Sequence, residues 1–222
     1  NNMISEVLWD LKKDAIRKMI KAGKRPDGRQ MDEYRKIEFF PDFVPRAEGS
    51  CLVKLGDTQV LVGIKTSVEE PYPDTPDQGS MSVGCEMGPL ASPLFQPGPP
   101  DENSVEVARV VDRGVRESKM IDLEKLCIKS REKVWNVFFD IHILDDHGNL
   151  FDAASLACVK ALLSARFPKY EDDKITYGEK CDPIPVREKP VSSTFAKVDG
   201  TIILDPSYEE EKAMDCRFTI VT

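Results

Sequence analysis

The stretch DENSVEVARVVDRGVRESKM, residues 101–120, has the pattern of one helix whose two sides differ in chemistry. At about 100° per residue, five charged residues share one narrow stripe: Glu102, Glu106, Arg109, Arg113 and Arg116. Guanidinium groups are planar and permanently charged and suit phosphate oxygens, so the stripe is a candidate anion-binding surface. The alternative is an ordinary solvated face, on which Glu106 pairs with Arg109.

The other side of this helix carries small side chains, which would let another backbone approach: Ser104, Val107, Val111, Gly114 and Ser118. Strand patterns precede the helix. Segments rich in Val, Ile, Leu and Phe predict strands over residues 35–44, 50–55, 58–66 and 81–87. Gly56-Asp57 predicts a tight hairpin between the second and third of these. Within the third, the nearly continuous apolar run predicts a strand covered on both faces.

Further elements follow the helix. A strong strand pattern covers residues 134–144, and Asp152 is a predicted cap for a largely apolar helix that runs to Arg166. Residues 170–189 read as a polar connector containing prolines. Three short strands are predicted at the end, over residues 191–196, 201–204 and 217–222. This order predicts a mixed α/β fold built of two similar halves.

The first residues form a separate predicted unit. Residues 3–22 place apolar side chains on a helical period, and Gly23 follows as a stop. We therefore divide the chain into an N-terminal helical arm, residues 1–24, and a domain over residues 25–222. The apolar face of the arm must cover apolar surface, either on its own domain or on a neighbouring molecule.

The composition is that of an ordinary globular protein, with 41% hydrophobic and 32% charged residues in a chain of 222. A formal net charge of −8 repels nucleic acid and anionic membranes on average. Any nucleic-acid role therefore needs a local basic patch or a partner that supplies positive charge. The sequence opens without a signal peptide and has no apolar run of about eighteen residues, which predicts a cytoplasmic protein without membrane association.

The cysteines and one run of acidic residues are the candidate metal ligands in the sequence. The six cysteines lie more than twenty residues apart, so they predict free thiols in a reducing compartment rather than a zinc site. The acidic run of Asp205, Glu209, Glu210, Glu211 and Asp215 is either a divalent-cation site or a solvated surface. We predict no metal site in this chain.

Five segments, in this order, resemble the RNase PH family: RPDGR at 25–29, CLVKLGDTQVLVGIK at 51–65, ENSVEVARVVDRGVRESKMIDLEKLCI at 102–128, LDDHGNLFDAASLA at 144–157 and VDGTIILDPSYEEE at 198–211. The resemblance is to the archaeal exosome subunits that lack a complete active site and alternate with a catalytic paralogue in a six-membered ring. It implies an RNase PH-like fold of two βαββα-like halves packed together. Family members usually continue past the position of Thr222 with a strand and a helix, which this chain is expected to lack.

Departures from the family pattern imply that the chain is inactive alone. By this resemblance, catalytic members share an Arg-Arg pair at the position where this chain has Glu102-Asn103. Their phosphate-holding Gly-Gly-Thr-Arg turn is replaced by residues 147–150, which end in Leu150. Of the two late carboxylates, Asp205 matches the first, and Glu211 takes the second position with one methylene more than the usual Asp. A carboxylate where phosphate should sit repels it, so no catalytic residue is assigned here.

The same resemblance implies a role in binding RNA. Arg109 and Arg113 match positions at which the inactive subunit lends arginines to the RNA track beside the catalytic paralogue, and Arg116 continues the stripe. The implied partners are that paralogue, RNA-binding cap proteins and single-stranded RNA. The chain itself would use no cofactor, and inorganic phosphate, with or without Mg²⁺, would act at the partner's site.

Two other readings stay open at this point. One is a self-sufficient phosphorolytic enzyme of the same fold, against which Glu102, Asn103 and Leu150 count. The other is a scaffold without RNA contact, in which the arginines only pair with glutamates.

Overall fold

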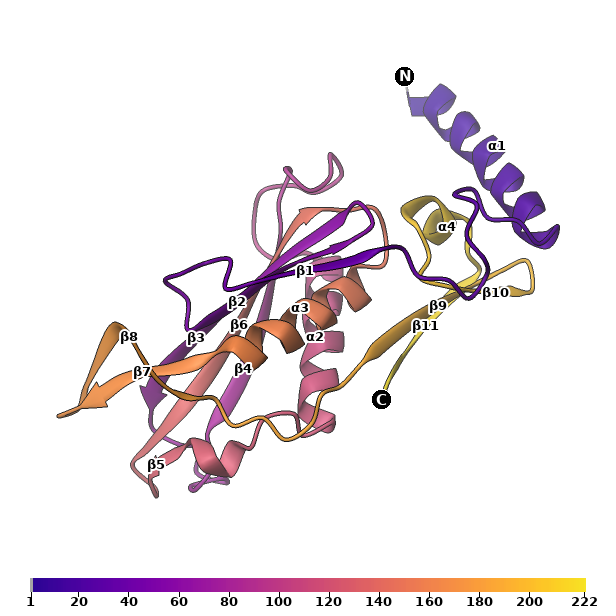
Figure 1. The fold of residues 1–222 in the computed structure, drawn as a ribbon. Coiled ribbons are helices and arrows are strands. Elements are labelled where there is room, and N and C mark those ends of the chain that lie inside the picture. Colours follow the sequence, from indigo (N-terminus) through magenta and orange to yellow (C-terminus); the bar gives the residue numbers. More distant parts are fainter. Residues whose placement is uncertain (1) are drawn as a thin grey trace.

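The computed structural model describes the backbone of residues 2–222 and the side chains of residues 9–222. Its larger part is a sheet in the order β1-β2-β3-β6-β4, with the short β5 paired to β6 (Figure 1). Its strands are β1 (Ile37–Pro41), β2 (Gly49–Leu55), β3 (Thr58–Glu69), β4 (Ser80–Met87), β5 (Cys127–Lys129) and β6 (Lys133–Asp145). All neighbours are antiparallel except β4 and β6, which are parallel.

Two helices, α2 (Glu102–Glu117) and α3 (Leu150–Ser164), pack on one face of this sheet and enclose the main core. Exposure alternates along β3, where Val60, Val62 and Ile64 are buried and the residues between them are half-buried. The prediction that this strand is covered on both faces was therefore wrong. The nearly continuous apolar run contains Leu61 and Gly63, which lie on the side away from the helices.

Helix α2 begins after Asp101, whose side chain accepts a hydrogen bond from the N–H of Ser104 at 2.8 Å. Its buried residues are Ser104, Val107, Val111 and Val115. A Cβ at Gly114 would meet only the side chain of Val221, at 3.6 Å. The neighbour at Gly114 is thus a side chain rather than the close backbone that the small residues suggested.

The start of α3 differs from the prediction. Its N-cap is Asn149, in a left-handed conformation with φ of 55°, and not Asp152. Asp152 lies in the first turn and is completely buried, so its carboxylate serves long-range contacts instead of the cap. A left-handed cap is favourable for Asn because its short side chain can bond to the local backbone.

Residues 166–183 form a hairpin where a polar connector was predicted. Strand β7 (Arg166–Glu171) pairs antiparallel with β8 (Lys174–Pro183), which is almost wholly exposed. The hairpin extends to one side of the large sheet (Figure 1). Phe167 stacks on Trp135 of β6 with ring centroids 4.9 Å apart, and this contact anchors the base of the hairpin. The polar composition of this segment predicted a connector, but an exposed hairpin needs few apolar residues and can have the same composition.

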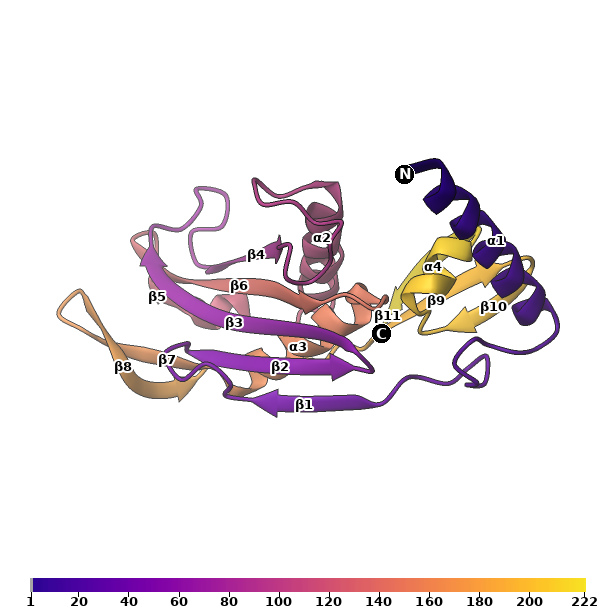
Figure 2. The same ribbon diagram turned by 90° about the horizontal axis from the view of Figure 1, so that it is seen from above.

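The smaller part of the molecule contains a sheet in the order β10-β9-β11, built from β9 (Ser192–Val198), β10 (Thr201–Leu204) and β11 (Cys216–Val221). The short helix α4 (Tyr208–Ala213) and the N-terminal helix α1 (Asn2–Lys21) lie against it (Figure 2). Ile16 and Ile20 of α1 are buried in a second apolar cluster with Ala196, Val198, Ile203 and Ala213. The arm therefore covers its own chain. A short 3₁₀ helix, η1 (Leu123–Leu126), precedes β5.

The packing of α1 leads to a first prediction. Ile20→Ala should lower the free energy of unfolding by about 2–4 kcal/mol, because it leaves a cavity in the second apolar cluster. Leu11→Ala is the matched control: Leu11 lies on the same helix but is 63% exposed, and its replacement should cost no more than about 0.5 kcal/mol. Urea denaturation measures both. Equal losses would show that α1 does not pack as described.

Candidate functional site

The acidic segment after β10 is neither a solvated surface nor an open cation site. Asp205 and Glu210 are completely buried. Asp205 has a φ of 51°, and its N–H donates to the carbonyl of Thr194 at 3.0 Å, which turns its side chain toward the larger part of the molecule. Both alternatives that the sequence left open for this segment were therefore wrong for these two residues.

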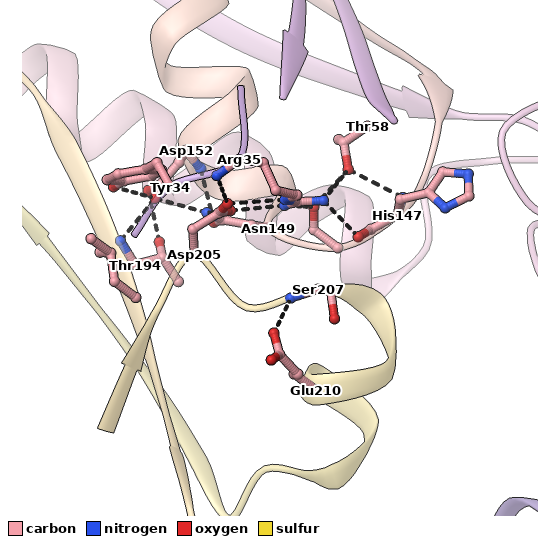
Figure 3. Close-up of polar contacts among 12 residues, drawn as sticks. Tyr34, Arg35, Thr58, His147, Asn149, Asp152, Thr194, Asp205, Ser207 and Glu210 are labelled. Carbon is pink, nitrogen blue, oxygen red and sulfur yellow. Dashed lines mark hydrogen bonds and ion pairs between the residues drawn. The ribbon is translucent and has the colours of Figure 1, made fainter. Parts of the chain in front are cut away.

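The carboxylate of Asp205 accepts five hydrogen bonds, and Figure 3 shows Asp205 with two of its partners, Arg35 and Asn149. Arg35 provides three of them, from its N–H, Nε and Nη2, at 2.8–2.9 Å. Nη1 of Arg29 and Nδ2 of Asn149 provide the others, at 2.8 and 2.7 Å. Burial alone would raise the pKa of Asp205, but the Arg35 guanidinium and the Asn149 amide outweigh it and lower the pKa.

A second buried pair lies beside the first. Nε and Nη2 of Arg25 donate to the two carboxylate oxygens of Glu210 at 2.8 and 2.7 Å, and both side chains are fully buried. Nη2 also donates to the carbonyl of Asp205, and Nη1 to that of Leu204, each at 2.8 Å. The turn at residues 25–35 therefore connects α1 to β1 and at the same time holds the segment that follows β10.

The network continues into α3 through Asn149. Its Nδ2 also donates to Oδ2 of Asp152 at 2.9 Å. The same Asp152 carboxylate accepts from the hydroxyls of Tyr34, Ser192 and Thr194 and from the N–H of Thr194 at 2.8–2.9 Å. The carboxylates of Asp152 and Asp205 thus join the start of α3 to β9 and to the segment after β10.

The turn before α3 allows no other residue at Gly148. Its φ is 88°, and a Cβ there would lie 2.4 Å from the N atom of Tyr208. Arg35 fixes this turn, because its guanidinium donates to the carbonyls of His147 and Gly148 at 2.9 and 3.0 Å. The turn that in catalytic relatives is expected to hold phosphate is thus used here to receive an arginine of the same chain.

A pocket of about 260 Å³ lies between the start of α2 and α4. Asn103, Leu150 and Glu211, which the sequence singled out as departures from the catalytic pattern, line it together. Asp205 is not among its lining residues, because it lies behind Asn149 in the buried network. Four carboxylates reach this pocket, those of Asp101, Glu106, Asp146 and Glu211, against the cations Lys212 and Arg217.

The pocket is unfavourable for anions. Burial raises the pKa of Glu211 to about 7, and the nearby carboxylate of Asp146 adds to the rise. The N–H of Asn149, 3.0 Å from Oε1, and Arg217, 3.8 Å away, only partly offset it. Burial raises the pKa of Asp146 as well. A phosphate entering this pocket would meet four acidic side chains and two cations, of which Arg217 already pairs with Glu106.

The arginine stripe of α2 is exposed, and its members differ. Arg116 donates twice to Asp112, from Nε at 3.1 Å and Nη2 at 2.7 Å, so its charge is balanced locally. Arg109 and Arg113, one helical turn apart, have no ion-pair partner among the described side chains. Glu106 pairs with Arg217 of β11 at 3.2 Å rather than with Arg109. The reading in which Glu106 neutralises Arg109 was therefore wrong.

Sequence reasoning missed four arginines that shape the site. The sequence pattern places Arg25 and Arg29 only within the RPDGR segment, and Arg35 and Arg217 only as the first residues of predicted strands. Arg217 lies 4.0 Å above the ring of Phe151 and bridges Glu106 toward Glu211. The sequence pattern gave no signal for these partners before β1: a buried carboxylate requires a cation, but Arg25, Arg29 and Arg35 lie 170–185 residues from the carboxylates that they bind.

No group of three or more His, Cys, Asp or Glu residues in the described part of the chain is arranged to hold a metal ion. All six cysteines are free thiols. No helix in the described residues is long and apolar enough to span a bilayer.

Comparison with known proteins supplies the family. A model of the 3′ exoribonuclease family, the RNase PH type, matches residues 33–168 as its first domain and residues 189–222 as its second. The chain belongs to the RNase PH family. It is 51% identical over 220 residues to the exosome complex component Rrp42 of Archaeoglobus fulgidus, covering 99% of this chain and 83% of that protein. The corresponding Thermococcus gammatolerans protein is 50% identical over 222 residues, covering 98% and 81%.

Solved structures of the RNase PH family agree with the fold. A chain of the A. fulgidus exosome with RNA bound to the active site superposes with a TM-score of 0.90 at 52% identity, covering 97% of this chain and 84% of that one. A chain of an archaeal exosome core gives a TM-score of 0.86 at 47% identity, covering 98% and 82%. Rice Rrp46, at 20% identity and a TM-score of 0.67, shares the fold. The predicted RNase PH-like fold is thus confirmed.

The buried network leads to a second prediction. Asp205→Asn should lower the free energy of unfolding by about 3–5 kcal/mol, because it leaves Arg29 and Arg35 without their counter-charge. Asp199→Asn is the control, since Asp199 also has a positive φ but makes only an exposed pair with Lys21. The free energy of unfolding of Asp199→Asn should fall by no more than about 1 kcal/mol. Denaturant titration of both variants decides; a small effect at Asp205 would contradict the network.

A third prediction concerns pH. Because the folded chain holds a proton on Glu211 up to about pH 7, the unfolded chain binds fewer protons between the ordinary pKa of 4.5 and 7. The contribution of Glu211 to stability therefore falls as pH rises through that window. Glu211→Gln should remove this fall and exceed the original chain by on the order of 1–3 kcal/mol at pH 8.

The measurement is the free energy of unfolding from pH 5 to pH 8. Glu209→Gln serves as the control, because Glu209 lies on the exposed side of α4 and pairs with Lys12. Parallel pH profiles for the original chain and Glu211→Gln would contradict the assignment.

Proposed function

We propose that this chain is the non-catalytic RNase PH-type subunit of an exosome core ring, a phosphate-dependent 3′→5′ exoribonuclease. It is inactive alone, alternates with a catalytic paralogue in a hexameric ring, and helps to shape that partner's active site. Inorganic phosphate, with Mg²⁺ if the reaction uses it, acts at the partner's site. Cap proteins that bind RNA complete the particle in the cytoplasm.

The pocket supports the absence of catalysis. Attack by phosphate on an RNA phosphodiester brings two polyanions together, so a phosphorolytic site must first supply positive charge. Here Arg29 and Arg35 form ion pairs with Asp205, and Arg217 forms one with Glu106. These three positive charges are therefore already balanced within the chain. The pocket itself is lined by the acidic residues Asp101, Glu106, Asp146 and Glu211 against the cations Lys212 and Arg217.

The observation that carries the proposed RNA contact is the exposed arginine pair on α2. Arg109 and Arg113 are exposed, lie one turn apart and have no acidic partner among side chains 9–222. Their guanidinium groups are free to bind phosphates of a single strand without reading its sequence. Arg116, held by Asp112, contributes less. This local pair accounts for RNA contact by a chain with a net charge of −8.

The comparisons support the assembly. The relatives are named exosome components, and one of the similar structures is an exosome with RNA at its active site. The alternative of self-sufficient phosphorolysis is disfavoured by the pocket. The alternative of a scaffold without RNA contact is distinguished by the following experiment.

The fourth prediction concerns RNA affinity of the ring assembled from this chain and its catalytic paralogue. Arg109→Glu with Arg113→Glu should weaken binding of single-stranded RNA by about tenfold or more at low salt, because two charge-assisted contacts become repulsive. The slope of log affinity against log salt should flatten by roughly one unit per lost contact.

The control is Lys174→Glu with Lys180→Glu on the exposed strand β8, which changes the net charge by the same amount. It should leave affinity and slope nearly unchanged. Equal effects of the two double variants would show that RNA affinity depends on the net charge of the chain and not on the arginines of α2. No effect of either would support a scaffold without RNA contact.

A further inference from the structure

Arg109 on α2 has acidic neighbours that could neutralise it. Side chains three or four positions apart on a helix are neighbours on its surface. For Arg109 these positions hold two carboxylates, those of Glu106 and Asp112. Arg109 nevertheless forms no ion pair with any side chain of residues 9–222. Both carboxylates are instead bound by other arginines.

Glu106 is bound by a residue from another part of the fold. Nη2 of Arg217, on β11, donates to Oε1 of Glu106 at 3.2 Å. Arg217 has two further contacts: its guanidinium lies 4.0 Å from the ring centroid of Phe151, and its Nη1 lies 3.8 Å from Oε1 of Glu211. A side chain held in this way loses little further freedom when it pairs, whereas Arg109 is exposed and would have to be ordered. Arg217 is therefore the favoured partner of Glu106.

Asp112 is bound within the helix. Nε and Nη2 of Arg116 donate to its two carboxylate oxygens, at 3.1 and 2.7 Å. A pair of hydrogen bonds between a guanidinium and a carboxylate is stronger than a single one. Nη2 of Arg116 also donates to the carbonyl of Met81 at 3.2 Å, which fixes the side chain against β4. Asp112 therefore pairs with Arg116 and not with Arg109.

Glu106 borders both the groove of about 560 Å³ that Arg109 lines and the groove of about 580 Å³ that Arg217 lines. We infer that Arg217 is a positioning residue: by holding Glu106, it keeps the guanidinium of Arg109 unpaired. Arg116 has the same role through Asp112. The inference concerns the charge state of α2 in the chain by itself, and only its consequence for RNA rests on the proposed function.

Modification of single arginines in the isolated chain tests this role. Phenylglyoxal attacks the neutral guanidine, so a neighbouring carboxylate, which stabilises the charged form, slows the reaction. Arg217→Gln frees Glu106 and should slow the modification of Arg109 about twofold, the size expected for one pair on a helix surface. Mass spectrometry of peptides gives the rate at each arginine. Arg131, which is exposed and lies outside α2, is the internal reference.

A second substitution separates positioning from damage to the fold. Arg217→Gln combined with Glu106→Gln frees no carboxylate, so the rate at Arg109 should return at least to that of the original chain. Lys180→Gln, on the exposed strand β8, removes one positive charge elsewhere and should leave the rate unchanged. The inference is overturned if Arg217→Gln does not slow the modification of Arg109, or if Glu106→Gln does not reverse the slowing.

The second carboxylate gives an independent comparison. Arg116→Gln frees Asp112 and should also slow the modification of Arg109 about twofold. Adding Asp112→Asn should restore the rate. An unchanged rate in Arg116→Gln would overturn the role of Arg116.

The RNA affinity of the assembled ring distinguishes this inference from the proposed function. Arg217→Gln should weaken the binding of single-stranded RNA about twofold, and adding Glu106→Gln should restore it. If Arg109→Glu with Arg113→Glu leaves the RNA affinity of the ring unchanged, the proposed RNA contact is wrong. The modification rates in the isolated chain still decide whether Arg217 keeps Arg109 unpaired.

Discussion

The pairing of Asp205 with Arg29 and Arg35 is the constraint on which the rest of the structure depends. A carboxylate that is completely buried must be matched by cations and hydrogen-bond donors, or its burial costs several kcal/mol. The match here joins the turn before β1, the turn before α3 and the segment after β10. These ion pairs hold the six-stranded and the three-stranded sheets together, and their charges are therefore not free to bind a ligand.

The distribution of the other arginines follows from the same requirement. Arg25 balances Glu210, Arg217 balances Glu106, and Arg116 balances Asp112. What remains along α2 is the pair Arg109 and Arg113, unmatched in the described residues and facing outward. An acidic chain can therefore present a small cationic surface without being a general polyanion binder. Within the described residues, a pocket with few unpaired cations and an exposed arginine pair both follow from this distribution of ion pairs.

Local pattern was enough to place most elements, because amphipathic period and turn residues are properties of neighbours in sequence. Helix α2 was predicted at residues 101–120 and is found at 102–117, and the strands before it were located to within a few residues. The partner of Asp205 was not predictable this way, since Arg35 lies 170 residues away. The cap at Asn149 and the hairpin at residues 166–183 were missed because polar residues specify little unless their contacts are known.

The central claim is that this chain supports RNA decay without performing it. The most direct measurement is phosphate-dependent shortening of a single-stranded RNA by the chain alone, by the catalytic paralogue alone and by the two mixed. The account predicts no nucleoside diphosphate release from the chain alone and more from the mixture than from the paralogue alone. Release by the purified chain alone, or a mixture no more active than the paralogue, would contradict it.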